Sequence, residues 1–311
     1  MSNNEYEIVV SGGGIAGLTA ALTAARLGRK TLILSGAVPG GHLLSIERID
    51  GYPGFPDGIS GYELCPMTQE AAMAEGVEFA PVELVAVTRD AGGFSIEAET
   101  GTWHTRSLIM ATGAHLKRLS VPGEAGFTGK GVSHCASCDG PMLKGKTAVV
   151  VGGGDSALQE SLTLAAHAAS VIVLQKEAQL TGQPVYQRLV TEQSRISVRC
   201  GMLVEEILGA QVVSGVRVRD LATGATSDLP AEAVFIYIGM APNSGLVTQF
   251  VKLDENAQIP VDAKMRTTVP GLLAAGLVRS GAAGRAVASA GDGAAAAASA
   301  DSFLRDGLWR Q

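Results

Sequence analysis

The chain has 311 residues, a formal net charge of −6, 46% hydrophobic residues and 17% charged residues. This length exceeds what one core comfortably serves and predicts two domains. The mild acidity and the lack of a basic run argue against nucleic acid as a partner, and no stretch reaches the roughly 18 apolar residues of a membrane span. Because the first residues do not read as a secretory leader, we expect a cytoplasmic protein without a membrane partner.

The first 34 residues predict a strand, a tight turn, a helix and a second strand. Residues 6–10 are mostly apolar, residues 18–27 carry the small and apolar residues of a closely packed helix, and residues 30–34 are again mostly apolar. A strand followed by a glycine-rich turn and a helix is the unit that binds dinucleotides.

The turn itself carries Gly12, Gly14 and Gly17 in G-x-G-x-x-G spacing. Gly12 permits the sharp turn, Gly14 leaves room for a pyrophosphate near the backbone, and Gly17 lets the helix pack against the strand. The N-terminus of the helix that follows supplies unpaired N–H groups for the phosphates, and Ile15 and Ala16 lie in the turn directly before it. We therefore predict that this turn binds a dinucleotide.

The same unit recurs later in the chain. Residues 146–151 predict a strand, and Gly152, Gly154 and Ala157 occupy the three turn positions. A helix to about residue 168 and a strand at 170–174 follow. Two such units predict an α/β fold with two Rossmann-like dinucleotide-binding domains. At this second turn, a glycine-rich turn without a ligand stays open as the alternative.

Three further segments indicate how the domains are connected. Residues 107–112 predict a strand that ends at a glycine, residues 234–239 predict a second exit, and residues 271–276 precede a small-residue helix at about 286–304. We predict that the second domain is inserted into the first. The first domain then comprises residues 1–116 and 245–311, and the inserted domain comprises residues 117–244.

Cys135 and Cys138 form a close cysteine pair, followed directly by Asp139. Two intervening residues allow a small disulfide ring, helical backbone after the first cysteine lowers a thiolate pKa, and the carboxylate can move the proton that dithiol chemistry requires. Zinc is the alternative, but it needs four ligands, and Cys65 and Cys200 stand alone in the sequence. We therefore predict a redox pair, no metal site, and packing roles for the other two cysteines.

Together these motifs resemble those of the low-molecular-weight thioredoxin reductases over nearly the whole chain. The matching stretches are SGGGIAG (11–17), PGGHL (39–43), GYPG (51–54), ATG (111–113), CASCDG (135–140), GGGDSA (152–157), IG and PN (238–239, 242–243) and AAG (274–276). In that family the redox pair lies in the inserted domain, whereas larger relatives carry it in the FAD domain.

The resemblance implies an FAD-dependent disulfide oxidoreductase. Electrons would pass through the flavin to the Cys135–Cys138 disulfide, with Cys138 facing the flavin, Cys135 attacking a thioredoxin-like protein or a small disulfide, and Asp139 acting as acid and base. The inserted domain would swivel between these tasks, and a homodimer is usual. Besides the first turn, the resemblance places these residues at FAD: Ser35, Gly41, His42, Leu43, Ala111, Thr112, Gly113, Gly276, Arg285 and Ala286.

The chain departs from the family where electrons enter. NADPH-dependent members hold the 2′-phosphate with His-Arg-Arg and a later arginine, but this chain has Gln175, Lys176, Glu177 and Thr181 there. One lysine beside a repelling glutamate is a poor match for a phosphate, so we expect a donor other than NADPH. Glu177 is suited instead to accept from the 2′-OH of NADH, with an exposed loop that binds nothing as the alternative.

An atypical subgroup of thioredoxin-reductase-like flavoproteins lacks the arginine motif and takes electrons from ferredoxin or through a second flavin. The retained second turn beside lost phosphate anchors fits that subgroup. A second FAD and NADH are therefore the candidate ligands of Gly152, Gly154 and Ala157.

The C-terminal FAD motif also departs from the family. The usual Gly-Asp is Gly276-Leu277 here, so the aspartate that normally binds FAD is missing, and Arg285-Ala286 follows a glycine in place of the usual sequence. Ser35 stands where many flavoproteins place an acid that binds ribose, and His42 replaces a glutamine. We expect a remodelled FAD site or other groups that compensate.

The leading hypothesis is therefore an FAD-dependent disulfide oxidoreductase with a donor other than NADPH. The alternatives are an NAD(P)H-dependent thioredoxin reductase, a dithiol oxidase that forms disulfides and returns electrons to oxygen, and a non-catalytic relative that kept the fold.

Overall fold

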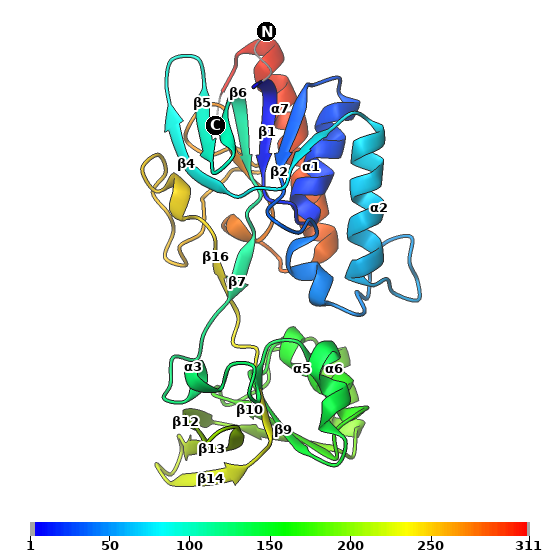
Figure 1. Cartoon of the computed structure of the whole chain (residues 1–311), viewed down its shortest axis with the longest axis vertical. Coiled ribbons are helices and arrows are strands. Elements are labelled where there is room, and N and C mark those ends of the chain that lie inside the picture. Colours follow the sequence, from blue (N-terminus) through cyan, green and yellow to red (C-terminus); the bar gives the residue numbers. More distant parts are fainter. Residues whose placement is uncertain (1–3, 310–311) are drawn as a thin grey trace. The chain divides into compact units, whose positions relative to one another are not determined.

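The computed structural model describes residues 4–309, which divide into two compact units (Figure 1). The first unit comprises the described residues up to His115 and from Ala241 onward, and the second runs from Leu116 to Met240. These borders lie one and four residues from those expected from the sequence. The chain therefore leaves the first unit, builds the second and returns.

The first unit contains one large sheet and three long helices. The helices are α1 (Ile15–Arg26), α2 (Gly61–Ala74) and α7 (Ala286–Asp306), and short 3₁₀ turns lie at Gly41–Ser45, Gly245–Val247 and Gly276–Val278. The strands are β1 (Glu5–Ser11), β2 (Thr31–Leu34), β3 (Glu78–Ala80), β4 (Leu84–Arg89), β5 (Phe94–Ala98), β6 (Gly101–Met110) and β17 (Leu272–Ala274). Two short strands, β7 (Ala114–Leu116) and β16 (Met240–Pro242), pair where the chain crosses between the units.

The sheet of the first unit has the order β3-β2-β1-β6-β5-β4, with β17 also paired to β6. The central strand β1 runs parallel to β2 and β6. Its residues Ile8, Val9 and Val10 are fully buried, because both faces of the sheet are covered. An apolar run without alternation is what a strand buried on both faces requires.

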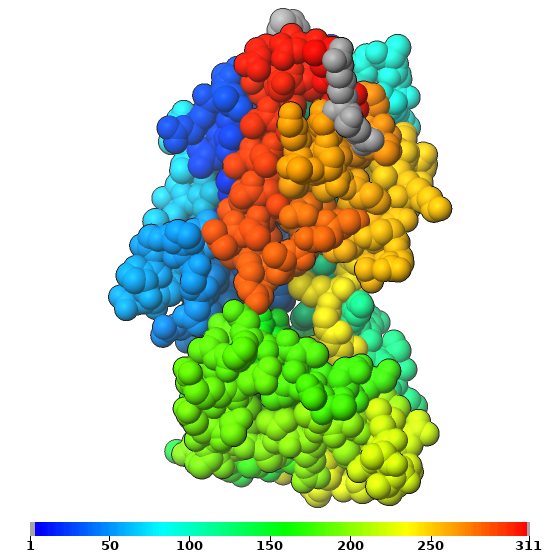
Figure 2. Space-filling model, turned by 180° about the vertical axis from the view of Figure 1, so that it is seen from behind, coloured from blue at the N-terminus to red at the C-terminus, as the bar shows by residue number. Residues whose placement is uncertain are grey.

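The C-terminal helix α7 packs closely on α1 because small residues line their contact. Ala296, Ala297 and Ala300 are fully buried, and a Cβ at Gly293 would collide with the carbonyl oxygen of Ala16. Figure 2 shows this helix running along the outside of the first unit. The alanine-rich C-terminal sequence is therefore a structural helix and lies over the start of α1.

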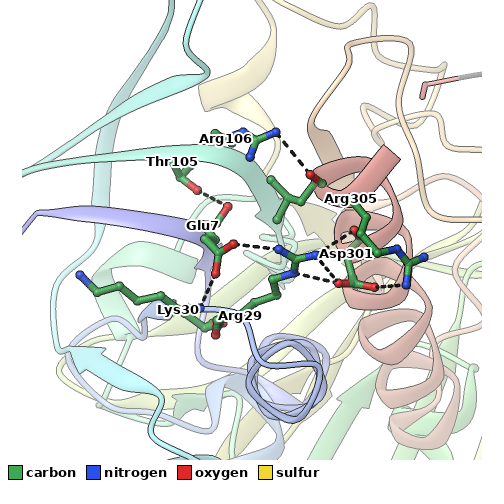
Figure 3. A network of polar contacts seen from close by, with 9 residues as sticks. Glu7, Arg29, Lys30, Thr105, Arg106, Asp301 and Arg305 are labelled. Atoms are coloured by element: carbon green, nitrogen blue, oxygen red, sulfur yellow. Dashed lines mark hydrogen bonds and ion pairs between the residues drawn. The ribbon is translucent and has the colours of Figure 1, made fainter. Parts of the chain in front are cut away.

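Charged side chains join β1, the loop between α1 and β2, and α7 (Figure 3). Arg29 Nη1 lies 2.8 Å from Glu7 Oε1, and Arg29 Nη2 lies 2.7 Å from Asp301 Oδ1. Burial opposes ionisation of Glu7, but hydrogen bonds from the Lys30 backbone and Arg29 outweigh it and hold the pKa of Glu7 below its usual value. The side chains of Arg29 and Asp301 are 17% and 11% exposed, so this pair is shielded from solvent screening.

The second unit contains a parallel sheet covered by helices and by a second sheet. Its helices are α3 (Glu124–Phe127), α4 (Ala136–Asp139), α5 (Asp155–Ala165) and α6 (Pro184–Glu192), with a 3₁₀ turn at Gly140–Leu143. Its parallel sheet has the order β11-β10-β9-β15-β8, from β8 (Val132–Ser133), β9 (Thr147–Val151), β10 (Ser170–Gln175), β11 (Ile196–Cys200) and β15 (Ala233–Ile236). The other sheet is antiparallel and comprises β12 (Met202–Gly209), β13 (Val213–Asp220) and β14 (Thr226–Pro230).

Alternate residues of β9 face the two cores of this unit. Val150 packs with Leu158 and Leu164 of α5, whereas Val149 packs with residues of β12 and β13 such as Val216. Helices thus cover one face of the parallel sheet and the antiparallel sheet covers the other. Each unit thus has a mainly or fully parallel sheet in which one strand leads through a glycine-rich turn into a helix. This confirms the predicted fold class of two Rossmann-like domains.

Several predicted elements have different limits in the structure, and the helix expected at 18–27 runs from Ile15 to Arg26. The strand expected at 107–112 already begins at Gly101 and ends at Met110, because its first half pairs antiparallel with β5. The helix expected to run to about 168 ends at Ala165, and the strand expected at 234–239 ends at Ile236. Within residues 4–309, no helix combines the length and apolar character needed to cross a bilayer.

Replacing Asp301 with asparagine should lower the free energy of unfolding by about 3 kcal/mol, because Arg29 would lose a shielded counter-ion. Urea unfolding followed by circular dichroism measures this change. Asp306→Asn, in the same helix but with a side chain 51% exposed, is the matched control and should change it by less than about 0.5 kcal/mol. Equal effects of the two substitutions would contradict a structural role for the Arg29–Asp301 pair.

Candidate functional site

The first glycine-rich turn lies where β1 ends and α1 begins. Gly12 has a φ of 114°, and a Cβ there would collide with the carbonyl oxygen of Ala111. A Cβ at Gly17 would collide with the carbonyl oxygen of Gly12, whereas one at Gly14 would meet no described atom within 4 Å. The described residues place no side-chain cap on the N-terminus of α1 at Gly14. This backbone leaves room and N–H groups for a pyrophosphate, and so it fits FAD.

Three further segments meet at this turn. The N–H of Gly40 donates to the carbonyl oxygen of Gly13 over 2.7 Å, and a Cβ at Gly276 would lie 2.9 Å from Cβ of Ala16. The N–H of Ala111 donates to Ser11 over 2.8 Å, which aligns the end of β6 with the end of β1. The structure thus brings together predicted site residues from four parts of the chain: Gly12, Gly14, Ile15, Ala16, Gly17, Gly41, His42, Leu43, Ala111, Thr112, Gly113 and Gly276.

The remaining predicted FAD residues take different positions. Ser35 is buried at the end of β2, where its hydroxyl donates to the carbonyl oxygen of Gly36 over 3.1 Å. Arg285 is the residue before α7, and Ala286 packs in the same apolar cluster as Ile15. Each of these residues therefore lies on an element that adjoins the first turn or on the neighbouring strand.

His42 lies half-buried in the 3₁₀ turn that follows Gly40. Burial lowers the pKa of its imidazole below the ordinary value of 6.5. The ring is therefore neutral at neutral pH and can both donate and accept a hydrogen bond.

A carboxylate that the sequence motifs do not reveal reaches this site from α7. Asp292 Oδ2 accepts from the backbone N–H of Gly276 over 3.2 Å. The same carboxylate binds Arg279, with Nε at 2.7 Å from Oδ2 and Nη2 at 2.8 Å from Oδ1. The side chains of Asp292 and Arg279 are 9% and 15% exposed. Asp292 thus brings a negative charge to the turn where the family's aspartate is missing. No sequence motif marks it, since α7 carries two further aspartates, Asp301 and Asp306.

The second glycine-rich turn repeats the backbone geometry of the first. Gly152 has a φ of 131°, and a Cβ there would collide with the carbonyl oxygen of Tyr237. Gly154 precedes α5 without a side-chain cap among the described residues, and Ala157 is fully buried in the first turn of that helix. This turn also fits a dinucleotide at the level of its backbone.

The residues that would select the nucleotide lie at the end of β10. Gln175 is buried, and its side chain packs on Gly153 while its amide donates to the carbonyl oxygen of Gln179 over 3.3 Å. The next two side chains, Lys176 and Glu177, are exposed. The nearby charge is therefore one cation beside one anion, as the sequence indicated.

The redox pair forms a disulfide at the start of α4. Cys135 and Cys138 are bonded to each other, with their Cα atoms 5.3 Å apart. Cys135 precedes the helix and its Sγ accepts from the backbone N–H of Cys138 over 3.3 Å. The Ser133 hydroxyl accepts from the N–H of Cys135 over 3.1 Å, and Cys138 is exposed. A sulfur that accepts a backbone N–H at a helix start is stabilised as a thiolate after reduction.

The other two cysteines are separate from this pair. Cys65 is buried, and burial raises the pKa of its thiol to about 11, so it is unreactive near neutral pH. Cys200 is half-buried at the end of β11. Across residues 4–309, no three His, Cys, Asp or Glu side chains gather as metal ligands would.

Two dinucleotide turns and a disulfide in the inserted unit define a flavin-dependent disulfide oxidoreductase. The chain belongs to the family of pyridine nucleotide-disulphide oxidoreductases, whose model matches residues 6–293. Its similarity to the relatives below is strong enough to make it an FAD-dependent, thioredoxin-reductase-like enzyme.

Thioredoxin reductases from several organisms resemble this chain over nearly its whole length. That of Treponema pallidum is 36% identical over 300 residues, which covers 96% of this chain and 97% of the relative. The crystal structure of Lactococcus lactis thioredoxin reductase has a TM-score of 0.94 at 34% identity and covers 97% of this chain and 99% of that chain. NADPH-dependent thioredoxin reductase 3 of Arabidopsis thaliana is 36% identical over 306 residues, 96% of this chain and 58% of that relative.

These similarities bear on the expected electron donor. The expectation of a donor other than NADPH gains no support from them, and the alternative of an NAD(P)H-dependent thioredoxin reductase fits them better. The sequence departure at residues 175–177 is nevertheless a feature of this chain.

Replacing Asp292 with asparagine should weaken FAD binding at least tenfold, because Gly276 and Arg279 would lose their shared anionic partner. Equilibrium dialysis of the unfolded-and-refolded protein against FAD, read by flavin fluorescence, measures the affinity. Asp262→Asn removes a comparable ion pair, Arg266 to Asp262 at 2.6 Å, and should leave FAD affinity within twofold of the parent. Unchanged affinity in folded Asp292→Asn protein would show that this carboxylate does not organise the FAD site.

Proposed function

We propose that this protein is a thioredoxin reductase, which transfers electrons from a reduced pyridine nucleotide to the disulfide of a thioredoxin-like protein. The observation that carries the proposal is the Cys135–Cys138 disulfide at the start of α4, with one sulfur held by a backbone N–H and the other residue exposed. The relatives, which are named thioredoxin reductases, support the choice of partner.

FAD bound at the first glycine-rich turn would supply the two-electron chemistry between the donor and the disulfide. The residues that fit it are Gly12, Gly14 and Gly17, the segment at Gly41–Leu43, and Gly276 with the carboxylate of Asp292 behind it. His42 stands where the family has a glutamine, and its neutral ring can hydrogen-bond the flavin there.

The reduced pair then reacts as a dithiol. The Cys135 thiolate attacks one sulfur of the partner's disulfide, so that an S–S bond forms between the proteins and the partner's own S–S bond breaks. Cys138 next attacks Cys135 Sγ, which restores the internal disulfide and releases the partner as a dithiol. The partner has then gained two electrons and two protons. Asp139 passes on the proton that Cys138 loses, and water supplies the second proton, which Cys135 had lost on becoming a thiolate.

Single cysteine variants test this order of events. Cys138→Ser should trap a stable mixed disulfide with thioredoxin after reduction, because the resolving thiol is gone, whereas Cys135→Ser should trap none. Both should lose thioredoxin reduction by at least a thousandfold while their flavin is still reduced by the donor. Non-reducing gel electrophoresis and anaerobic absorbance spectroscopy report these outcomes.

Cys200→Ser, which lies outside the pair, is the control and should keep full activity. The function is refuted if anaerobically reduced flavin never passes electrons to the Cys135–Cys138 disulfide. Peroxide release with a dithiol substrate would instead favour a dithiol oxidase, and colourless protein that takes up no FAD would favour a non-catalytic relative.

The charges at the second turn favour a second candidate for the donor. Lys176 beside Glu177 neutralises less of a 2′-phosphate than a pair of arginines does, and Glu177 suits a free 2′-OH. Under this second candidate the chain belongs to the atypical subgroup of thioredoxin-reductase-like flavoproteins. Either NADH or a second FAD then binds at Gly152, Gly154 and Ala157, or reduced ferredoxin supplies the electrons. With either electron donor, we propose that the protein is a cytoplasmic homodimer.

Reversing the charge at this loop discriminates the donors. Lys176→Arg combined with Glu177→Arg should raise kcat/KM for NADPH at least tenfold relative to NADH, because a charge-assisted phosphate site replaces a repelling carboxylate. Anaerobic stopped-flow bleaching of the flavin by NADPH, NADH and reduced ferredoxin gives the rates. Glu192→Arg, an equal charge reversal at an exposed site on α6, should leave the preference unchanged. No response of the double variant to either nucleotide would place the donor elsewhere.

A further inference from the structure

Tyr237 connects the second glycine-rich turn with the redox pair. Its backbone N–H donates to the carbonyl oxygen of Val151 over 2.8 Å, and its own carbonyl oxygen fills the space that a Cβ at Gly152 would need. Its side chain belongs to the core cluster that contains Ala136, the first residue of α4. One residue thus touches both the backbone of a dinucleotide turn and the helix that carries the disulfide.

The adjacent residue binds the segment before the pair. The carbonyl oxygen of Ile236 lies 3.1 Å from Nδ1 of His134, directly before Cys135. The end of β15 therefore holds the redox segment from two sides, by a hydrogen bond at His134 and by the Tyr237 ring under α4.

The Tyr237 hydroxyl lacks a hydrogen-bond partner although it is buried. The residue is 7% exposed, and among residues 4–309 its oxygen is the one buried side-chain N or O atom without a partner. A buried polar group without a partner destabilises the state in which it is left unpaired. Burial, the nearby carboxylate of Glu160 on α5 and that of Asp139 raise the pKa of Tyr237 above its ordinary value, so the group stays a neutral hydroxyl.

The main chain of Ala136 is the neighbour that the hydroxyl is placed to bond. Its N–H acts on the hydroxyl as a weak donor that lowers the pKa of Tyr237, but in the disulfide state this contact falls outside normal hydrogen-bond geometry. Ala136 is the first residue of a helix of four residues, whose first N–H groups have no partner within the helix. The disulfide ties the two ends of this short helix together, Cys135 to Cys138.

We propose that Tyr237 is a positioning residue for the redox pair: its hydroxyl is unpaired while the disulfide holds α4, and it hydrogen-bonds the Ala136 N–H once the S–S bond opens. Opening the bond adds two electrons and two protons from a dithiol, which becomes a disulfide, and both cysteines end as thiols. The hydroxyl itself exchanges no proton. The inference rests on the proposed function because it assumes that this pair cycles between its two states.

The missing hydrogen bond raises the energy of the disulfide form relative to the dithiol form. Tyr237 therefore makes the pair easier to reduce. Tyr237→Phe keeps the ring and removes the unpaired oxygen from the disulfide form, and it leaves the Ala136 N–H unpaired in the dithiol form. Both effects shift the equilibrium toward the disulfide.

The equilibrium of the holoenzyme with reduced and oxidised dithiothreitol, without donor or partner, tests the inference. Anaerobic samples are alkylated, and peptide mass spectrometry gives the reduced fraction of Cys135 and Cys138 apart from the other cysteines. Tyr237→Phe should lower the equilibrium constant for reduction about tenfold, which is about 30 mV. An unchanged constant, or a shift toward the dithiol, would overturn the inference.

A buried tyrosine with a satisfied hydroxyl provides the control. Tyr6 is 7% exposed and donates to Glu78 Oε2 over 2.7 Å, so Tyr6→Phe should alter stability and leave the redox equilibrium within twofold. Urea unfolding of Tyr237→Phe in both states adds a second reading, in which stability should fall in the dithiol form alone. An equal fall in both forms would assign the residue a structural role only. Because no partner or donor is used, failure of thioredoxin reduction would leave these results unaffected and would be recognised separately.

Discussion

The close approach of backbone to backbone at the two glycine-rich turns is the constraint on which the rest of the structure depends. At Gly12 and Gly152 the space of a side chain is filled by a carbonyl oxygen from a neighbouring segment, Ala111 in one unit and Tyr237 in the other. Any Cβ would force the helix away from the sheet. With glycine there, the helix begins directly at the end of the first strand, and its N–H groups meet a cofactor's phosphates at the same edge as the other site residues.

Two buried ion pairs hold helix α7 in its position beside the first glycine-rich turn. In the first unit, Asp292 and Asp301 lie on the same helix, α7, and each binds a poorly exposed arginine. Asp301 binds Arg29 in the loop between α1 and β2, and Arg29 in turn binds Glu7 of β1, whereas Asp292 reaches the turn at Gly276. The alanines and glycines between them permit the close packing of α7 on α1 that places both carboxylates. Removing one partner of such a pair leaves an uncompensated charge away from water.

In the second unit, the same residues at the end of β15 contact both the second glycine-rich turn and the segment that carries the redox pair. The last residue of β15, Ile236, contributes a carbonyl oxygen to His134, and Tyr237 after it contributes a carbonyl oxygen to the Gly152 turn and an aromatic ring to the core beside α4. The disulfide therefore does not lie on an independent loop. Its surroundings depend on the same residues that shape the second turn, which gives this unit a physical route by which the state of the pair alters local packing.

The amino-acid sequence by itself determined the fold class, the two glycine-rich turns and the redox pair, because each depends on residue types at short, regular spacing. The structure extended this to contacts between distant parts of the chain. Asp292 reaches Gly276, and the Tyr237 hydroxyl is buried without a partner near Ala136. Neither follows from local spacing, since both arise only when helices and strands pack. The sequence predicted the charges at residues 175–177, but only packing showed that Gln175 is buried on Gly153 and that the two charged side chains face solvent.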